Sequence, residues 1–163
     1  MSPLDPRGSP PTPLVEEAEL PFFVYGTLRP GEHNHDLFLR GRTRSEEPGR
    51  MRGLALYAGP GYPYAVDEPG GTVCGEIVTA GPGAYEELLA ELDELEEYVP
   101  GDARSLYERV VRDAVRADGV TVVRAWVYVA GPAVAARLRS GGTPIAGGDW
   151  RGPRTDAPAR RDG

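Results

Sequence analysis

The chain has 163 residues, a formal net charge of −7 and 26% charged side chains, which is typical of a single globular domain. Its 22 glycines and 17 prolines are too many helix breakers for an all-helical bundle, and its acidic balance argues against a general nucleic-acid-binding protein. The single cysteine, Cys74, excludes an internal disulfide framework and any multi-cysteine zinc site.

The two ends of the chain have the composition of disordered tails. Residues 1–20 contain five prolines and show no periodicity, and residues 153–163 are similarly polar, so we expect one folded domain over residues 21–152. No apolar run approaches the roughly 20 residues that a membrane helix needs, and the N-terminus has no signal-peptide pattern. We therefore expect a cytoplasmic protein that binds neither membrane nor nucleic acid.

Apolar and alternating runs predict the strands. In chain order they cover residues 21–25, 51–58, 72–79, 107–116 and 121–130. The last two runs flank Asp118-Gly119, a dipeptide that favours a type I′ turn with positive φ at both central residues. This spacing predicts an antiparallel hairpin.

Two segments have helical periodicity. Residues 83–97 follow a Gly-Pro-Gly sequence, and residues 132–140 begin at Pro132 and end before a pair of glycines. Many strands with two helices indicate an α+β domain whose strands are mostly antiparallel.

The first of these helices singles out one carboxylate. At about 100° per residue, its leucines form one apolar stripe, most of its acidic residues lie outside the stripe, and Glu96 falls inside it. An ionised carboxylate aimed at a core or a cleft is costly unless it is paired, and burial raises its pKa toward the range of a useful general base. The alternatives are a structural ion pair with an arginine and a helix that frays before Glu96.

A loop with a second candidate function follows the first strand. Its sequence is Tyr25-Gly26-Thr27-Leu28, and a glycine at a strand end can expose consecutive backbone N–H groups that bind a carboxylate or phosphate. An ordinary strand-exit turn explains the same residues. The nearby His33-Asn34-His35 lacks a third ligand, so we expect no metal site. Tyr62 belongs to a turn that could form an aromatic pocket wall.

Several of these segments, in the same order, resemble motifs of the gamma-glutamylcyclotransferase-like family. They span roughly residues 21–152 and read PFFVYGTLRPGEHNH, GPGYPYAV, VCGEIV, LDELEEY, LYERVV and GGDW. The resemblance implies a small, mostly antiparallel β-barrel with flanking helices. It maps the family's catalytic glutamate onto Glu96 and its substrate-binding loop onto Tyr25, Gly26, Thr27 and Leu28. It also makes Tyr62, Tyr107 and Arg109 candidates for the pocket wall.

The sequence departs from the family pattern at Glu97, because the family usually has glycine after its catalytic glutamate. The resemblance otherwise implies a cofactor-independent enzyme, monomeric or homodimeric, that cyclises a γ-glutamyl amide to 5-oxoproline and releases an amine, with Glu96 as general acid and base. The alternatives are a non-catalytic module that binds a γ-glutamyl or carboxylate ligand, a γ-glutamyl amidase that releases glutamate, and an interaction domain whose acidic helix binds a basic partner.

Overall fold

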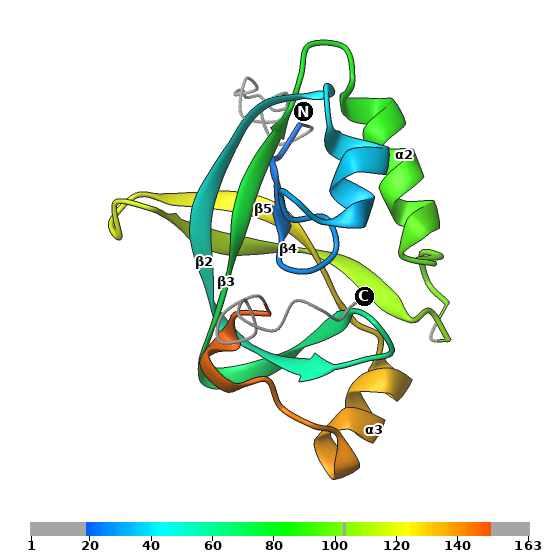
Figure 1. The fold of residues 1–163 in the computed structure, drawn as a ribbon. Helices are drawn as coiled ribbons and strands as arrows, with labels where there is room; N and C mark the ends of the chain where they lie inside the picture. Colours follow the sequence, from blue (N-terminus) through cyan, green and yellow to red (C-terminus); the bar gives the residue numbers. More distant parts are fainter. Residues whose placement is uncertain (1–18, 103, 151–163) are drawn as a thin grey trace, which may run out of the picture.

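A closed five-stranded barrel forms the centre of the protein in the computed structural model, which describes residues 19–102 and 104–150. The predicted tails lie outside these residues, apart from residues 19–20. The strands are β1 (Phe22–Val24), β2 (Thr43–Ala58), β3 (Pro63–Ala80), β4 (Tyr107–Arg116) and β5 (Val122–Ala130), and they pair in the order β1-β3-β2-β4-β5 (Figure 1). All neighbours are antiparallel except β1 and β5. The prediction of a mostly antiparallel barrel is confirmed.

Strands β2 and β3 are much longer than the apolar runs that predicted them. They pair from Thr43 opposite Ala80 to Ala58 opposite Pro63. The register shifts where Gly53 faces residues 68–71, and this irregularity absorbs a Pro-Gly-Gly sequence that normally ends a strand. Pairing with a long partner therefore extends both strands through segments whose own composition is poor for β-structure.

The predicted hairpin of β4 and β5 is present, but its turn is different. Arg116 and Thr121 close a four-residue loop, and the N–H of Gly119 donates to the carbonyl of Arg116 at 2.9 Å. Gly119 has a φ of 77°, whereas Asp118 does not have positive φ. The type I′ prediction was wrong because the Asp118 carboxylate accepts hydrogen bonds from the N–H groups of Val120 and Thr121, which stabilises a longer loop.

The helices lie outside the barrel. Helix α2 (Tyr85–Leu95) runs beside the π-helix η1 (His35–Leu39), while α3 (Pro132–Gly141) and the short 3₁₀ turn η2 (Ala146–Gly148) lie toward the other end (Figure 1). Helix α3 begins at Pro132, as predicted. Helix α2 is two residues shorter at each end than the predicted 83–97. No helix in the described part of the chain is long and apolar enough to cross a membrane.

Strand β1 joins the two hydrophobic clusters of the core, because it is buried on both faces. Phe22 and Val24 pack in the cluster that contains Leu88 and Leu92 of α2, whereas Phe23 belongs to the cluster inside the barrel. This position explains why the strand is apolar without alternation. It also fixes the loop that follows β1 at the junction between the barrel and α2.

Candidate active site

A cavity of about 220 Å³ lies at this junction. Its wall combines β1 and the loop after it, the β2–β3 turn, the end of α2, and residues from β4 and β5. Much of the wall is aromatic, and the charged residues that line it within the described chain are Glu96 and Glu97. The structure thus brings together two segments that the sequence singled out separately, the loop at Tyr25–Leu28 and the end of the acidic helix.

Glu96 lies in this wall immediately after the last residue of α2. Burial raises the pKa of the Glu96 carboxyl to about 7. Within residues 19–102 and 104–150, no arginine or histidine forms an ion pair with this carboxylate. A carboxyl group with this pKa exchanges protons readily near neutral pH, which suits a general acid and base.

Three tyrosines of the same wall do not supply Glu96 with a hydrogen bond. The hydroxyls of Tyr25, Tyr107 and Tyr128 donate instead to the carbonyl of Tyr128 (2.5 Å), the carbonyl of Pro63 (2.7 Å) and the carboxylate of Asp93 (2.6 Å). Each tyrosine has one hydroxyl proton, and all three protons are already used. Burial, together with the negative charge of Glu96, raises the pKa of Tyr25, so these hydroxyls stay protonated. The Glu96 carboxylate is therefore left without a donor from them.

The end of α2 is a Schellman motif that positions Glu96 and Glu97. The N–H of Tyr98 donates to the carbonyl of Asp93 at 3.0 Å, and the N–H of Glu97 donates to the carbonyl of Glu94 at 3.1 Å. This motif requires a left-handed residue at the position of Glu97, whose φ is 56°. Glu97 is the one non-glycine residue with positive φ in the described chain.

Helical periodicity also predicts that Glu97 lies outside the apolar stripe, on the solvent side, and the structure agrees. The chain leaves the helix at Leu95, however, so periodicity cannot show what else Glu97 contacts. Glu97 is exposed, yet it belongs to the cavity wall together with Glu96. Position 97 is where the family usually has glycine, and the left-handed φ is the physical reason for that preference.

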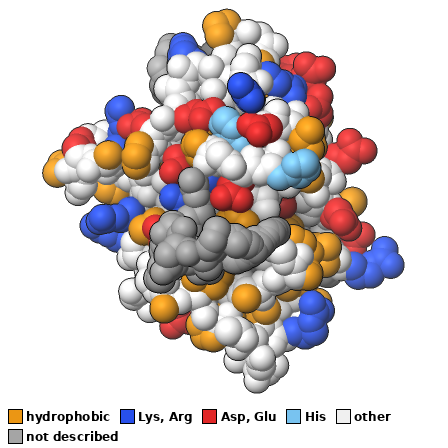
Figure 2. Space-filling view, in the orientation of Figure 1, with side chains coloured by type: hydrophobic (Ala, Val, Ile, Leu, Met, Phe, Trp, Pro, Cys, Tyr) orange, Lys and Arg blue, Asp and Glu red, His pale blue; other side chains and the backbone are white. Residues whose placement is uncertain are grey.

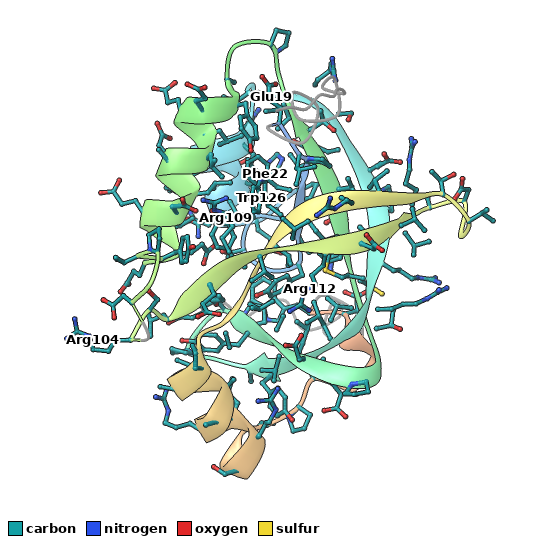
Figure 3. All side chains as sticks on the ribbon, turned by 180° about the vertical axis from the view of Figure 1, so that it is seen from behind. Glu19, Phe22, Arg104, Arg109, Arg112 and Trp126 are labelled. Carbon is teal, nitrogen blue, oxygen red and sulfur yellow. The ribbon has the colours of Figure 1, made fainter. Side chains whose placement is uncertain are left out.

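Asp93, one turn before Glu96, ties the end of α2 to the barrel. Its carboxylate accepts hydrogen bonds from the Tyr128 hydroxyl and from Nε of Arg109 at 2.8 Å. The Arg109 guanidinium lies 4.2 Å from the centre of the Trp126 ring, and the two side chains are close to Phe22 on the side that faces α2 (Figure 3). This clamp holds the last turn of α2, and with it Glu96, over the cavity.

The loop after β1 is a tight turn against the β2–β3 turn. The N–H of Arg29 donates to the carbonyl of Gly26 at 3.0 Å, and Nδ2 of Asn34 donates to Oγ1 of Thr27 at 2.9 Å. A Cβ at Gly26 would lie 2.8 Å from Cδ of Pro63, so glycine is required here by packing. In the described chain, the backbone N–H groups of residues 26–28 donate to no backbone carbonyl. They can therefore donate hydrogen bonds to an anionic group.

A partly buried ion-pair network anchors the same loop on its other side. The Arg29 guanidinium contacts the carboxylates of Glu76 on β3 and Asp149 near the end of the described chain, both at 2.8 Å. The Arg29 side chain is 10% exposed. Arg29 does not line the cavity, so this network acts as a support for the loop rather than as part of the wall.

The remaining predicted pocket residues divide between the cavity and its surroundings. Tyr62 and Tyr107 line the cavity, and their ring centres are 6.4 Å apart. Arg109 does not line it, because its guanidinium is held by Asp93 and Trp126. The described residues contain no group of three or more His, Cys, Asp or Glu side chains arranged to hold a metal ion.

Sequence reasoning gave no role to Asn34, Asp93 or Tyr128. Asn34 lies in the His33-Asn34-His35 segment and in the motif PFFVYGTLRPGEHNH, but neither pattern singles out its amide. Tyr128 lies in an alternating strand, where nothing distinguishes a tyrosine at a cavity from one in a core. Glu76 and Asp149 stood within resemblance motifs, so the charged residues in VCGEIV and GGDW were the available signal for the Arg29 network.

Comparison with known proteins shows the family. Residues 22–152 match the model of the family described as gamma-glutamyl cyclotransferase, AIG2-like. The chain belongs to this family. It is 37% identical over 108 residues to the gamma-L-glutamyl-butirosin B gamma-glutamyl cyclotransferase of Niallia circulans, a match that covers 66% of this chain and 64% of that relative. A provisionally named gamma-glutamylcyclotransferase of Halalkalibacterium halodurans is 46% identical over 33% of this chain and 46% of its own length.

Solved structures support the fold. A mouse AIG2-like protein superposes with a TM-score of 0.62 at 26% identity, over 84% of this chain and 92% of that one. An uncharacterised protein of Pyrococcus horikoshii gives a TM-score of 0.56 at 24% identity, over 84% and 94% of the two chains. The second likeness concerns the fold alone.

Proposed function

We propose that this protein cyclises γ-glutamyl amides, forming 5-oxoproline and releasing an amine, with Glu96 as the general acid and base. The observation that carries the proposal is the Glu96 carboxyl, which has a pKa of about 7 and lies in a cavity wall shared with the Tyr25–Leu28 loop. Membership of the gamma-glutamyl cyclotransferase family supports the reaction class. A relative named for action on gamma-L-glutamyl-butirosin B supports a γ-glutamyl substrate.

In this proposal the substrate's own α-amine is the nucleophile. The α-amino group of the glutamyl unit is mostly protonated at neutral pH, so it must lose a proton before it can attack. Glu96 accepts that proton as the amine nitrogen bonds to the γ-carbonyl carbon. The resulting tetrahedral intermediate collapses when Glu96 returns the proton to the leaving nitrogen and the original amide C–N bond breaks. The α-nitrogen loses a second proton as it becomes the lactam N–H, and the released amine takes up this proton and leaves as an ammonium ion. Atoms and charges balance without a cofactor.

The chain's other contribution to catalysis is to hold the folded substrate conformer. Attack within one molecule gains most of its rate from correct orientation, so a cavity of fixed shape is more useful than an additional reactive group. Backbone N–H groups of residues 26–28 are suited to the substrate α-carboxylate or to the developing oxyanion. The hydrogen bond from Asn34 to Thr27 and the Arg29 network keep this loop in place.

The test is product identity. The purified protein is incubated with a panel of γ-glutamyl amides, and 5-oxoproline, glutamate and the released amine are quantified by mass spectrometry. We expect 5-oxoproline and amine in equal amounts. Release of glutamate would assign the protein to the amidases. Binding of these amides without any product would identify a non-catalytic module, and either result would overturn the proposal.

A further inference from the structure

The charged residues of the cavity wall indicate which leaving amines the protein would favour. In the described chain, no arginine or histidine lines the cavity, and the two charged residues there are Glu96 and Glu97. The aromatic rings of Tyr62 and Tyr107 complete the same wall. Carboxylates together with tyrosine faces attract cations and repel anions.

Glu97 places a second negative charge in the cavity wall, closer to solvent than Glu96. Glu96 is half-buried and Glu97 is exposed, so the wall runs from Glu96 inside toward Glu97 at the mouth. Burial, a hydrogen bond with Tyr62 and the Glu97 charge raise the pKa of Tyr64 to about 12, while Arg137 lowers it. Arg137 is an exposed residue of α3 and forms no ion pair with Glu97 in the described chain.

Keeping glutamate at this position has a cost to folding. An L-residue in the left-handed region is disfavoured relative to glycine, and the Schellman motif would accept glycine without strain. Strained residues that persist at a cavity wall are often retained for function. The side chain of Glu97 forms no ion pair within the described residues, so structural pairing does not account for it.

We propose that Glu97 and the Tyr62–Tyr107 wall select leaving amines that carry a further positive charge. The inference rests on the proposed function, with the glutamyl unit held between Glu96 and the loop after β1. The rest of the amine then extends past Glu97 toward solvent. An ammonium on that part gains attraction to Glu97, whereas a carboxylate there is repelled by Glu96 and Glu97. Further acidic side chains lie along the edge of the molecule that α2 forms (Figure 2), but they do not line the cavity.

The experiment compares three γ-glutamyl amides of matched length, made from 1,5-diaminopentane, pentylamine and 5-aminopentanoic acid. They place an ammonium, a methyl group or a carboxylate at the far end. We expect kcat/KM for 5-oxoproline release to fall in that order. Glu97→Gln should lower the ratio between the cationic and the anionic amide by roughly threefold to tenfold, mainly through KM.

Two further variants separate recognition from structure. Glu97→Gly should lower the same ratio while raising the melting temperature, because it removes the charge and the strain together. Glu94→Gln removes one charge from an exposed residue of α2 that does not line the cavity, and should keep the wild-type ratio. Equal rates for the three amides, or an equal loss in Glu94→Gln and Glu97→Gln, would overturn the proposal.

A failure of the proposed cation preference can be distinguished from a failure of the proposed cyclase reaction. If the wild-type protein forms 5-oxoproline from none of the amides, the proposed function fails, and calorimetric titration then measures their binding directly. Tighter binding of the diaminopentane amide, weakened by Glu97→Gln, would still support the cation preference. Tighter binding of the carboxylate amide would contradict it.

Discussion

Two groups of half-buried carboxylates lie close to the loop at Tyr25–Leu28, and they differ in their partners. Glu76 and Asp149 each contact the Arg29 guanidinium at 2.8 Å. Glu96 lines the cavity with no ion-pair partner in the described chain, and burial raises its pKa to about 7. The same residue types therefore serve as a rigid support where an arginine compensates their charge, and as an exchangeable proton carrier where none does.

The largest expected effect comes from replacing Glu96, the carboxylate without an ion-pair partner. Glu96→Gln preserves the shape of the side chain and removes the base, so turnover should fall roughly 10²–10⁴-fold with little change in substrate affinity. Steady-state release of 5-oxoproline measures this loss. The matched control is Glu94→Gln, which changes the same charge outside the cavity and should stay within a factor of two or so of wild type. Full activity in Glu96→Gln would remove Glu96 from the mechanism.

Removing the arginine that pairs with Glu76 and Asp149 should affect folding instead. Arg29→Met removes the guanidinium that contacts the carboxylates of Glu76 and Asp149 and should lower the free energy of unfolding by about 3 kcal/mol. The control is Arg112→Met, which breaks an exposed pair with Asp67 and should cost less than about 1 kcal/mol. Urea denaturation measures both values. Equal losses would show that the Arg29 network is no more important than a surface pair.

The raised pKa of Glu96 also predicts how the stability of the protein depends on pH. The pKa of Glu96 is raised from 4.5 to about 7 in the folded protein, so the folded state holds this proton more tightly than the unfolded chain does. The favourable contribution is fully present below pH 4.5 and is lost as the pH rises to about 7. Glu96→Gln should therefore be more stable than wild type at pH 8, by up to about 3 kcal/mol, and the difference should vanish near pH 4. Thermal melts of both proteins across this range measure it. A variant that is less stable than wild type at pH 8 would indicate a hidden partner for Glu96.

The smallest expected effect comes from Tyr128, which lines the same cavity as Glu96. Tyr128→Phe removes the hydroxyl that donates to Asp93 and leaves the Arg109 bond in place, so stability should fall by about 1 kcal/mol. Turnover should fall far less than in Glu96→Gln, since the Tyr128 proton is already used. Assays of 5-oxoproline release and of thermal stability on the same preparation compare the two losses. A loss of turnover as large as that of Glu96→Gln would make Tyr128 a chemical participant.

Local signals predicted most elements of this fold. The apolar run of β1, the Asp118-Gly119 hairpin and the Pro132 start of α3 each depend on a few adjacent residues, and the structure contains all three. The closing pair of β1 with β5 and the lengths of β2 and β3 depend on partners distant in sequence. No local pattern encodes such pairings, so the barrel was expected only through the family resemblance.

Some residues of the site could also be predicted from the sequence, and others could not. Helical periodicity pointed to Glu96, although the helix ends one residue earlier and a Schellman motif sets its position. The same periodicity placed Glu97 toward solvent, and Glu97 is exposed, but it gave no sign that Glu97 also lines the cavity, because the helix ends before that residue. Tertiary hydrogen bonds place Asp93, Tyr128 and Asn34, and a single sequence carries no signal for them.

The most direct test of the unpaired carboxylate is its titration. Glutamate labelled with ¹³C at the side-chain carboxyl, with Glu96→Gln used to assign the signal, reports the protonation of Glu96 by NMR between pH 3 and pH 9. Burial without a partner predicts a midpoint near 7. A midpoint near the ordinary value of 4.5 would contradict the account, because Glu96 would then be solvated or paired and could not exchange protons near neutral pH.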